Sequence, residues 1–459
     1  MFMDNNEELK DTLLVIGNGY DLAAGLGSSY SDFYKSEEFK KFPSIWKEII
    51  PAPRDKSTTE DRWGEKPENW RDVETAIENV LIGEKNNGLV NLSYEDYIGY
   101  LDKLNQICNS LTDEEDVLVN GKSGLFLSDI SPKIMQALQE NFNGETDKIS
   151  QLEYKRLFEK LKSCSEQEKT FILIFFSCFR DSHQTFGHSF DDLQSDFVQY
   201  IMPSILNLKG KDTKTSEANK IRVDIANHFI KIFPFYIKAL LDELRSLENS
   251  FESFLINQCE NPFYMSYQLA NWPLKKLVNP DKLHGVLDFN YTQLGSIEGK
   301  VKVRHIHGSL SNHDIIFGID SHEYVDDDND HSKYQFDSSL LLPFTKNSRK
   351  FRIKPTGNFK INDQIKTIIF FGHSLGDADF SYFRYLFDEV NLYDSDCTII
   401  FNYSVYNDSK RLLIENDIFQ AVEHLMRKYQ STLETRKERV NLIDKLEFEQ
   451  RIRIEEVKL

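Results

Sequence analysis

The feature that most constrains the fold is the placement of short apolar runs along the chain. One run, Leu13–Ile16, stands near the N-terminus and stops at two closely spaced glycines. The other runs all lie after residue 280, at Gly285–Phe289, Val301–Ile306, Ile315–Gly318, Ile365–Phe371 and Cys397–Phe401. Such runs are typical of strands that are buried on both faces of a parallel sheet. We therefore predict an α/β fold whose parallel sheet combines two distant segments of the chain.

The chain divides most economically into three parts. Residues 1–35 and 280–405 form the predicted α/β domain, and residues 36–279 form a large, mostly helical insertion within it. Residues 406–459 read as a highly charged helical tail. The insertion and the tail are the parts that we expect to contact a protein partner or a second copy of the chain.

Apolar residues recur at helical spacing in the insertion. The pattern is clear in Asn69–Leu81, Ser189–Ile201 and His228–Leu247. Pro234 lies inside the third stretch and is expected to interrupt that helix, because proline lacks the amide hydrogen of the helical ladder.

The charge of the chain limits its partners. It has 459 residues, with 74 acidic against 55 basic side chains, and a formal net charge of −19. A surface of this sign repels phosphate backbones, which disfavours nucleic acid as the main ligand. A small anionic ligand remains compatible with this charge, because backbone amides at a helix N-terminus can bind it locally.

Three features predict a cytoplasmic protein. The N-terminal residues are polar and acidic, unlike a signal peptide. The longest apolar run, Phe171–Phe179, is far shorter than the ~20 residues that a membrane-spanning helix needs. The five cysteines are widely separated and form no C-x-x-C pair, so we expect reduced thiols and no zinc site.

Two polar motifs follow predicted strands in positions suited to a ligand. Gly17-Asn18-Gly19 ends the first strand, with Asp21 two residues later. The glycines allow a ligand to approach the backbone closely, but a tight turn capped by Asp21 explains them equally well. Asn290 stands at the end of another predicted strand. An asparagine at this place either faces a ligand crevice or only forms a turn.

Histidine and serine motifs add two further candidates. His305 and His307 alternate on a predicted strand and point to one face, but no third ligand at suitable spacing supports a metal. A single catalytic histidine before Gly308 fits better, since neutral imidazole is a suitable general base. Residues 372–376, GHSLG, match the nucleophile elbow of serine hydrolases around Ser374, but His424 is the only histidine downstream.

Together, these motifs resemble a known family. IGNGYDLAAGL at 16–26, FNYT at 289–292, HIHGSL at 305–310, IIFGID at 315–320 and FFGHSLGDADFSYF at 370–383 occur in the order and spacing of the AbiH family of bacterial abortive-infection proteins. NWRDVE at 69–74 extends the resemblance into the insertion. These proteins are counted among the sirtuin-like NAD-binding folds, so the resemblance implies a Rossmann-like sheet and an NAD site without a metal.

The resemblance also implies roles for individual residues. Asn290 lies where sirtuins have the asparagine of the nicotinamide pocket, and His307 matches their catalytic histidine. These two are the expected catalytic residues. The expected nucleotide-binding residues are Gly17, Asn18, Gly19, Asp21, Gly308, Gly372, His373, Ser374 and Asp377.

Three classes of function remain open. The four-cysteine zinc module of sirtuins is absent and His373 replaces a threonine, which disfavours protein deacylation. Sirtuin-like proteins of phage defence commonly destroy NAD, so the first expectation is an NAD glycohydrolase that depletes NAD. The alternatives are a sensor that binds NAD or ADP-ribose without turnover, and a serine hydrolase that uses Ser374.

Overall fold

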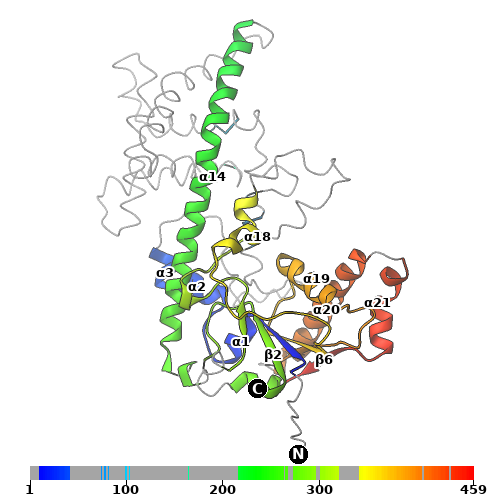
Figure 1. Cartoon of the computed structure of the whole chain (residues 1–459). Coiled ribbons are helices and arrows are strands. Elements are labelled where there is room, and N and C mark those ends of the chain that lie inside the picture. The colour runs from blue at the N-terminus through cyan, green and yellow to red at the C-terminus, as the bar shows by residue number, and fades with distance from the viewer. Residues whose placement is uncertain are drawn as a thin grey trace, which may run out of the picture.

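The computed structural model describes most of the α/β domain, the tail and the end of the insertion. Described are residues 10–41, 216–262, 264–266, 272–295, 300–319, 341–405, 408–433 and 436–459, with residues 74, 77, 78, 81, 99, 100, 103 and 164. A long helix, α14 (Ser216–Cys259), extends away from the α/β body (Figure 1).

The centre of the body is a six-stranded sheet in which every pair of neighbouring strands is parallel. Its strands are β1 (Thr12–Ile16), β2 (Leu283–Asp288), β3 (Val303–His305), β4 (Thr367–Phe371), β5 (Thr398–Tyr403) and β6 (Ile452–Glu456). Their spatial order is β3-β2-β1-β4-β5-β6, which is the order of dinucleotide-binding Rossmann sheets. The predicted Rossmann-like α/β sheet from distant chain segments is therefore confirmed.

The burial of β1 explains why its sequence is a continuous apolar run. Leu13 and Val15 belong to the hydrophobic cluster on one face of the sheet, which α19, α20 and α21 cover. Leu14 and Ile16 belong to the cluster on the other face, which includes Tyr20 and residues of α16. All four strand side chains are fully buried. A strand between two such layers has no polar face, so its sequence does not alternate.

The helices lie in the connections between strands. They are α1 (Asn18–Ala23), α2 (Tyr30–Lys35), α3 (Glu37–Lys41), α14, α16 (Trp272–Leu277), α18 (Lys346–Arg349), α19 (Phe380–Glu389), α20 (Arg411–Thr432) and α21 (Arg436–Phe448). Short 3-10 turns are η3 (Pro280–Lys282), η5 (Leu310–Asn312), η7 (Leu342–Phe344), η8 (Lys350–Arg352), η9 (Asp377–Asp379) and η10 (Asp408–Lys410).

Helix α14 connects the insertion to the α/β body. It runs unbroken through Pro234, so the predicted interruption there is wrong. One proline removes one hydrogen bond, and the rest of the ladder holds the helix together. Near its C-terminal end, α14 packs beside α3, where Ser250 Oγ donates to the carbonyl of Glu38 at 3.1 Å. Glu248 Oε2 accepts from Arg349 Nη2 of α18 at 2.7 Å, in a buried ion pair.

Other predicted helices of the insertion are described only in part. Within Asn69–Leu81, the described residues are helical, and Ile77 and Leu81 are fully buried, as the amphipathic pattern predicts. The stretch Ser189–Ile201 lies outside the described residues.

The prediction that the tail is helical throughout is wrong at its end. The tail is helical in α20 and α21, but Ile452–Glu456 forms β6 and pairs with β5. Arg451 fixes this strand, because its buried guanidinium donates to the carbonyls of Leu392, Tyr393 and Cys397. Strand β6 lies at the sheet edge and its Ile residues alternate with charged ones, which is the pattern of a half-exposed strand. The alternation covers only five residues and directly follows a charged helix, which is why it was predicted as part of the helical tail.

A second correction concerns Ile315–Gly318, which was predicted as a strand. The segment is buried, but it is a loop. The Ile316 amide donates to the carbonyl of His307 at 2.9 Å, and the Phe317 amide donates to Glu248 Oε1 at 2.7 Å. These bonds satisfy the backbone without a sheet, and a short apolar run does not distinguish the two cases.

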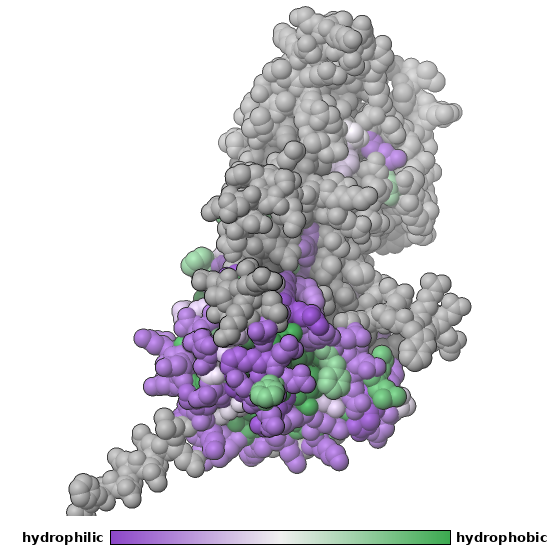
Figure 2. Space-filling view, turned by 90° about the vertical axis from the view of Figure 1, so that its right-hand side faces the viewer, coloured by the Kyte–Doolittle hydropathy of each residue, from purple (hydrophilic) through white to green (hydrophobic). Residues whose placement is uncertain are grey.

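Figure 2 shows the side of the α/β body that carries α20 and α21. On this face the described residues are mainly hydrophilic and surround a smaller group of hydrophobic ones. No helix in the described ranges combines the length and the apolar character needed to cross a membrane. The thiols of Cys259 and Cys397 form no disulfide within the described residues. Cys108 and Cys178 lie outside the described residues.

Candidate functional site

The candidate site lies at the carboxyl edge of the sheet. In the strand register, Ile16 pairs with Asp288 on one side and with Phe371 on the other, and Asp288 pairs with His305. The turns that follow β1, β2, β3 and β4 therefore leave the sheet at the same level. The order of the strands reverses between β1 and β4, and such a switch point is where α/β sheets bind ligands.

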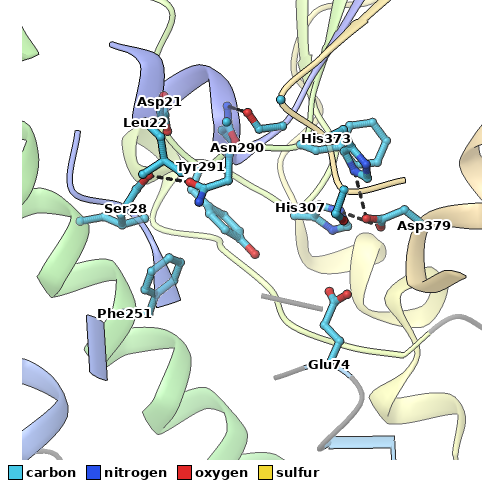
Figure 3. Close-up of a pocket in the computed structure, with 17 residues that line it drawn as sticks. Asp21, Leu22, Ser28, Glu74, Phe251, Asn290, Tyr291, His307, His373 and Asp379 are labelled. Carbon is cyan, nitrogen blue, oxygen red and sulfur yellow. Dashed lines mark hydrogen bonds and ion pairs between the residues drawn. The ribbon is translucent and has the colours of Figure 1, made fainter. Parts of the chain in front are cut away.

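A cavity of about 330 Å³ opens at this edge (Figure 3). This volume is at the lower end of the range for small-molecule sites. Of the predicted site residues, the cavity is lined by Gly17, Asn18, Gly19, Asp21, Asn290, His307, Gly372, His373 and Ser374. The structure also adds Leu22, Ser28, Glu74, Phe251, Leu255, Phe289, Tyr291 and Asp379.

The two glycines after β1 pack against the turn after β4. The amide of Gly17 donates to Phe371 O at 3.1 Å, and the amide of Gly19 donates to Gly372 O at 2.7 Å. A Cβ atom on Gly19 would lie 2.5 Å from the Cα atom of Gly372, whose own φ is +71°. Both amides are therefore already used to hold the two turns together.

We expect Gly19→Ala to lower the free energy of unfolding by about 1–3 kcal/mol, because the new methyl group overlaps backbone that cannot rotate away. Gly27→Ala is the matched control, since its nearest neighbour is the flexible side-chain end of Gln258 at 3.0 Å. Urea denaturation of both variants measures the difference. Equal stability of the two would contradict the packing role of Gly19.

Asp21 joins the turn after β1 to the turn after β2. Its buried carboxylate accepts from Thr292 Oγ1 at 2.9 and 2.8 Å and from Tyr264 OH at 3.5 Å. Burial raises the pKa of Asp21 to about 7, although the bonds from Thr292 and Tyr264 and the charge of His305 oppose this rise. Asp21 therefore lines the cavity and also connects the turns after β1 and β2.

This raised pKa predicts a pH-dependent stability difference between wild type and Asp21→Asn. A carboxyl group whose pKa is higher in the folded state stabilises the fold at low pH and loses that contribution as the pH rises. The asparagine variant should gain roughly 1–4 kcal/mol relative to wild type between about pH 4 and pH 8. Denaturation curves at several pH values measure this gain, and a difference that does not change with pH would contradict it.

Asn290 lies between the turns after β1 and β2. Its backbone amide donates to Asp288 Oδ1 at 2.8 Å, which shapes the turn after β2. Its side-chain Nδ2 donates to the carbonyl of Gly17 at 3.1 Å. Asn290 is 4% exposed, so this side chain is held in one place beside the cavity.

His307 has one bonded and one unbonded ring nitrogen. Its Nε2 lies 3.1 Å from Asp379 Oδ1, whereas its buried Nδ1 has no hydrogen-bond partner among the described residues. Burial, followed by the charge of Lys346, lowers the pKa of His307 to about 4, against the opposing effect of Asp379. His307 is therefore a neutral imidazole near pH 7, with a lone pair available on one nitrogen.

His305 does not share this environment. Strand β3 ends at His305, so the alternation that places both histidines on one face does not reach His307. The Nδ1 atom of His305 lies 3.4 Å from Asp288 Oδ2. No cluster of three or more metal-binding side chains occurs in the described part of the chain.

Two predicted nucleotide-binding residues do not line the cavity. Gly308 has a φ of +88° and packs against the backbone of Asp314. Asp377 accepts from His424 Nε2 at 2.9 Å and from Lys428 Nζ at 3.0 Å, both on α20. Asp377 was predicted to bind the nucleotide, but it is Asp379, two residues later, that lines the cavity.

The nucleophile-elbow motif does not form a hydrolase triad among the described residues. A positive φ occurs at Leu375, but not at Ser374. The serine side chain is exposed, and His424, the histidine that this interpretation requires, is bonded to Asp377. Ser374 is therefore a polar residue that lines the cavity, without the histidine partner of a nucleophile among the described residues.

Four of the lining residues that were not predicted, Glu74, Phe251, Leu255 and Asp379, do not directly follow a strand. Glu74 ends NWRDVE, the segment through which the family resemblance enters the insertion, and this was the available signal for it. Phe251 and Leu255 extend from α14 and form an apolar wall. For Asp379 the sequence signal was weaker. Asp377 and Asp379 both follow the glycine motif closely, and the sequence does not show which of them reaches the cavity.

The model of a family described as bacteriophage abortive infection AbiH matches residues 13–176 and 93–403, which include every turn of the site. The chain belongs to the AbiH family. AbiH membership implies a role in abortive infection, a form of anti-phage defence. No curated protein and no solved structure matches the chain.

Proposed function

We propose that this AbiH protein binds NAD at the carboxyl edge of its sheet and hydrolyses the bond between nicotinamide and ribose. The observation that carries the proposal is the buried, unpartnered Nδ1 atom of His307 in a cavity that also contains Asn290. An unprotonated nitrogen in such a place accepts a hydrogen bond from water or a ligand, and the attacking water of a hydrolysis is such a donor. We also propose that the NAD site is sirtuin-like, with Asn290 and His307 at the reacting end.

The residues around the cavity suit the two ends of a dinucleotide. Phe251 and Leu255 give an apolar wall for a flat ring. Asn18 and Ser374 provide polar side chains for ribose or phosphate, and Ser28 Oγ fixes Asn18 by donating to its Oδ1 at 2.6 Å. Since the amides of Gly17 and Gly19 are occupied, we assign phosphate contacts to these side chains.

The reaction needs little acid catalysis, because nicotinamide leaves as a neutral molecule from a cationic ring. The bond from the ribose carbon to the ring nitrogen breaks, and its electron pair stays with nicotinamide. A water oxygen forms the new bond to the ribose carbon and loses one proton to His307 Nδ1. The products are ADP-ribose, nicotinamide and one proton. Asn290 holds the reacting end in place, which accounts for rate through orientation.

Incubation of the purified protein with NAD tests this proposal. Chromatography should detect nicotinamide and ADP-ribose in equal amounts, and calorimetry with ADP-ribose should detect binding. If NAD binds but nicotinamide is never released, including with phage lysate added as a source of the trigger, the protein is a sensor. If neither nucleotide binds, the NAD site itself is wrong.

A further inference from the structure

Asp379 stands at the centre of the polar side of the cavity. It ends η9, just before α19, and its side chain is 13% exposed. Its Oδ1 lies 3.1 Å from His307 Nε2 and accepts from Lys346 Nζ at 2.8 Å. Its Oδ2 lies 3.2 Å from His373 Nε2. One carboxylate therefore contacts two imidazoles and one ammonium group, and Figure 3 shows the two rings converging on it.

These contacts specify which nitrogen of each ring carries the proton. A carboxylate accepts hydrogen bonds, so a neutral ring beside it carries its proton on the nearer nitrogen. For His373 the assignment has an independent support, because the amide of Leu375 donates to its Nδ1 at 2.9 Å. For His307, the same logic places the proton on Nε2 and leaves Nδ1 as the base atom.

Lys346 keeps this carboxylate charged. Its side chain is 2% exposed, and its ammonium group lies between Asp379 and Glu74 Oε1, the latter at 2.6 Å. Burial opposes ionisation of Asp379, but the charge of Lys346 and the bonds from the two histidines hold its pKa well below the usual range. Burial also opposes the charge of Lys346, yet the two carboxylates raise its pKa.

We infer that Asp379 is a positioning residue, which holds His307 with Nδ1 as its base atom and stabilises the imidazolium that forms when Nδ1 accepts a proton. The catalytic part of this inference rests on the proposed NAD cleavage, whereas the assignment of the ring protons does not. Lys346 supports Asp379, and Glu74 connects this ion cluster to the insertion.

The other groups that face His307 leave this assignment intact. The ring of Tyr291, after β2, and the ring of Tyr382, on α19, lie 6.4 and 5.8 Å from the imidazole. Burial raises the pKa of Tyr291 well above its usual value, so its hydroxyl stays neutral. Lys350 of η8 packs on the Tyr382 ring and, like Lys346, lowers the pKa of His307. The lysines and Asp379 thus determine the charge near this ring.

Nitrogen NMR of the ligand-free protein, labelled in histidine, tests the proton assignment without NAD. The signals of His307 are identified by their loss in His307→Gln. We expect Nδ1 of His307 to have the shift of an unprotonated nitrogen and Nε2 that of a protonated one. The reverse pattern would overturn the inference, whatever the protein does with NAD.

Asp379→Asn tests the positioning role, and Asp388→Asn, which removes an exposed acid from the following helix, α19, is its control. Asp379→Asn should lower kcat for NAD cleavage by about 10²–10⁴-fold with NAD affinity within about threefold of wild type. The control should keep both values. Circular dichroism verifies the fold, and wild-type kcat in Asp379→Asn would overturn the inference.

The pH profile of Lys346→Met separates this role from a merely structural one. Loss of the ammonium charge should raise the pKa of His307, so the acid limb of kcat should move to higher pH. A structural defect would lower kcat without moving this limb. An unshifted acid limb in an active Lys346→Met variant would overturn the assigned charge network.

Discussion

His307→Ala is expected to slow release of nicotinamide from NAD by about 10²–10⁴-fold while NAD affinity stays close to that of wild type. A general base acts mainly in the transition state, so its loss affects turnover more than binding. The geometry supports this role, because Nε2 of His307 is bonded to Asp379 and Nδ1 is unpartnered. Single-turnover rates and calorimetry measure the two quantities separately.

His424→Ala is the control for this experiment. His424 is the histidine that a serine hydrolase with this motif would require, and it is bonded to Asp377 outside the cavity. This variant should cleave NAD at the wild-type rate. If His424→Ala loses activity and His307→Ala keeps it, His307 is structural and the hydrolase alternative returns.

The pKa of His307 also predicts the pH dependence of wild-type cleavage. Burial lowers this pKa to about 4, so the ring is unprotonated and competent as a base throughout the neutral range. The rate should fall only as the pH approaches about 4 from above, because protonation removes the lone pair. An acid limb near the ordinary histidine value, about 6.5, would contradict the low pKa.

The fold could be predicted from sequence where burial leaves a clear pattern. Leu13–Ile16 is apolar at every position because each face of β1 is covered by its own cluster. Strand β6 lies at the sheet edge, and only Ile452 and Ile454 on one of its faces pack against a core cluster. Its alternating pattern is therefore short and highly charged, and it does not stand out from the charged helix before it. The loop at Ile315–Gly318 is as buried as a strand, and only its hydrogen-bond partners show the difference.

The site was predictable to the extent that it follows from parallel strands. Asn290 and His307 end up at one cavity because Asp288 and His305 pair in register two residues before them. Lys346 and Asp379 are different, because their contact joins α18 to η9, and the two residues are 33 positions apart in the sequence. Local patterns carry no information about such a contact. Gly17 and Gly19 line the cavity, but their packing partner, Gly372, could be seen only in three dimensions.

Combining Asn290→Ala with His307→Ala is expected to give a variant little slower than the more damaging of the two single variants. Asn290→Ala alone should slow cleavage by about 10²-fold and also weaken NAD binding, because it removes the group that positions the reacting end. Once the reacting end is misplaced, the base has no correctly held water to deprotonate. Two residues that act on one step in this way are not additive.

Asn402→Ala is the matched control for the asparagine variant. Asn402 is a buried asparagine near the carboxyl end of β5, outside the lining of the cavity. Its replacement should leave both NAD affinity and the cleavage rate unchanged. If the rate losses of Asn290→Ala and His307→Ala instead multiply in the double variant, the two residues serve independent steps. Asn290 would then act through the turn that it fixes by donating to the Gly17 carbonyl, and not through the reacting end of NAD.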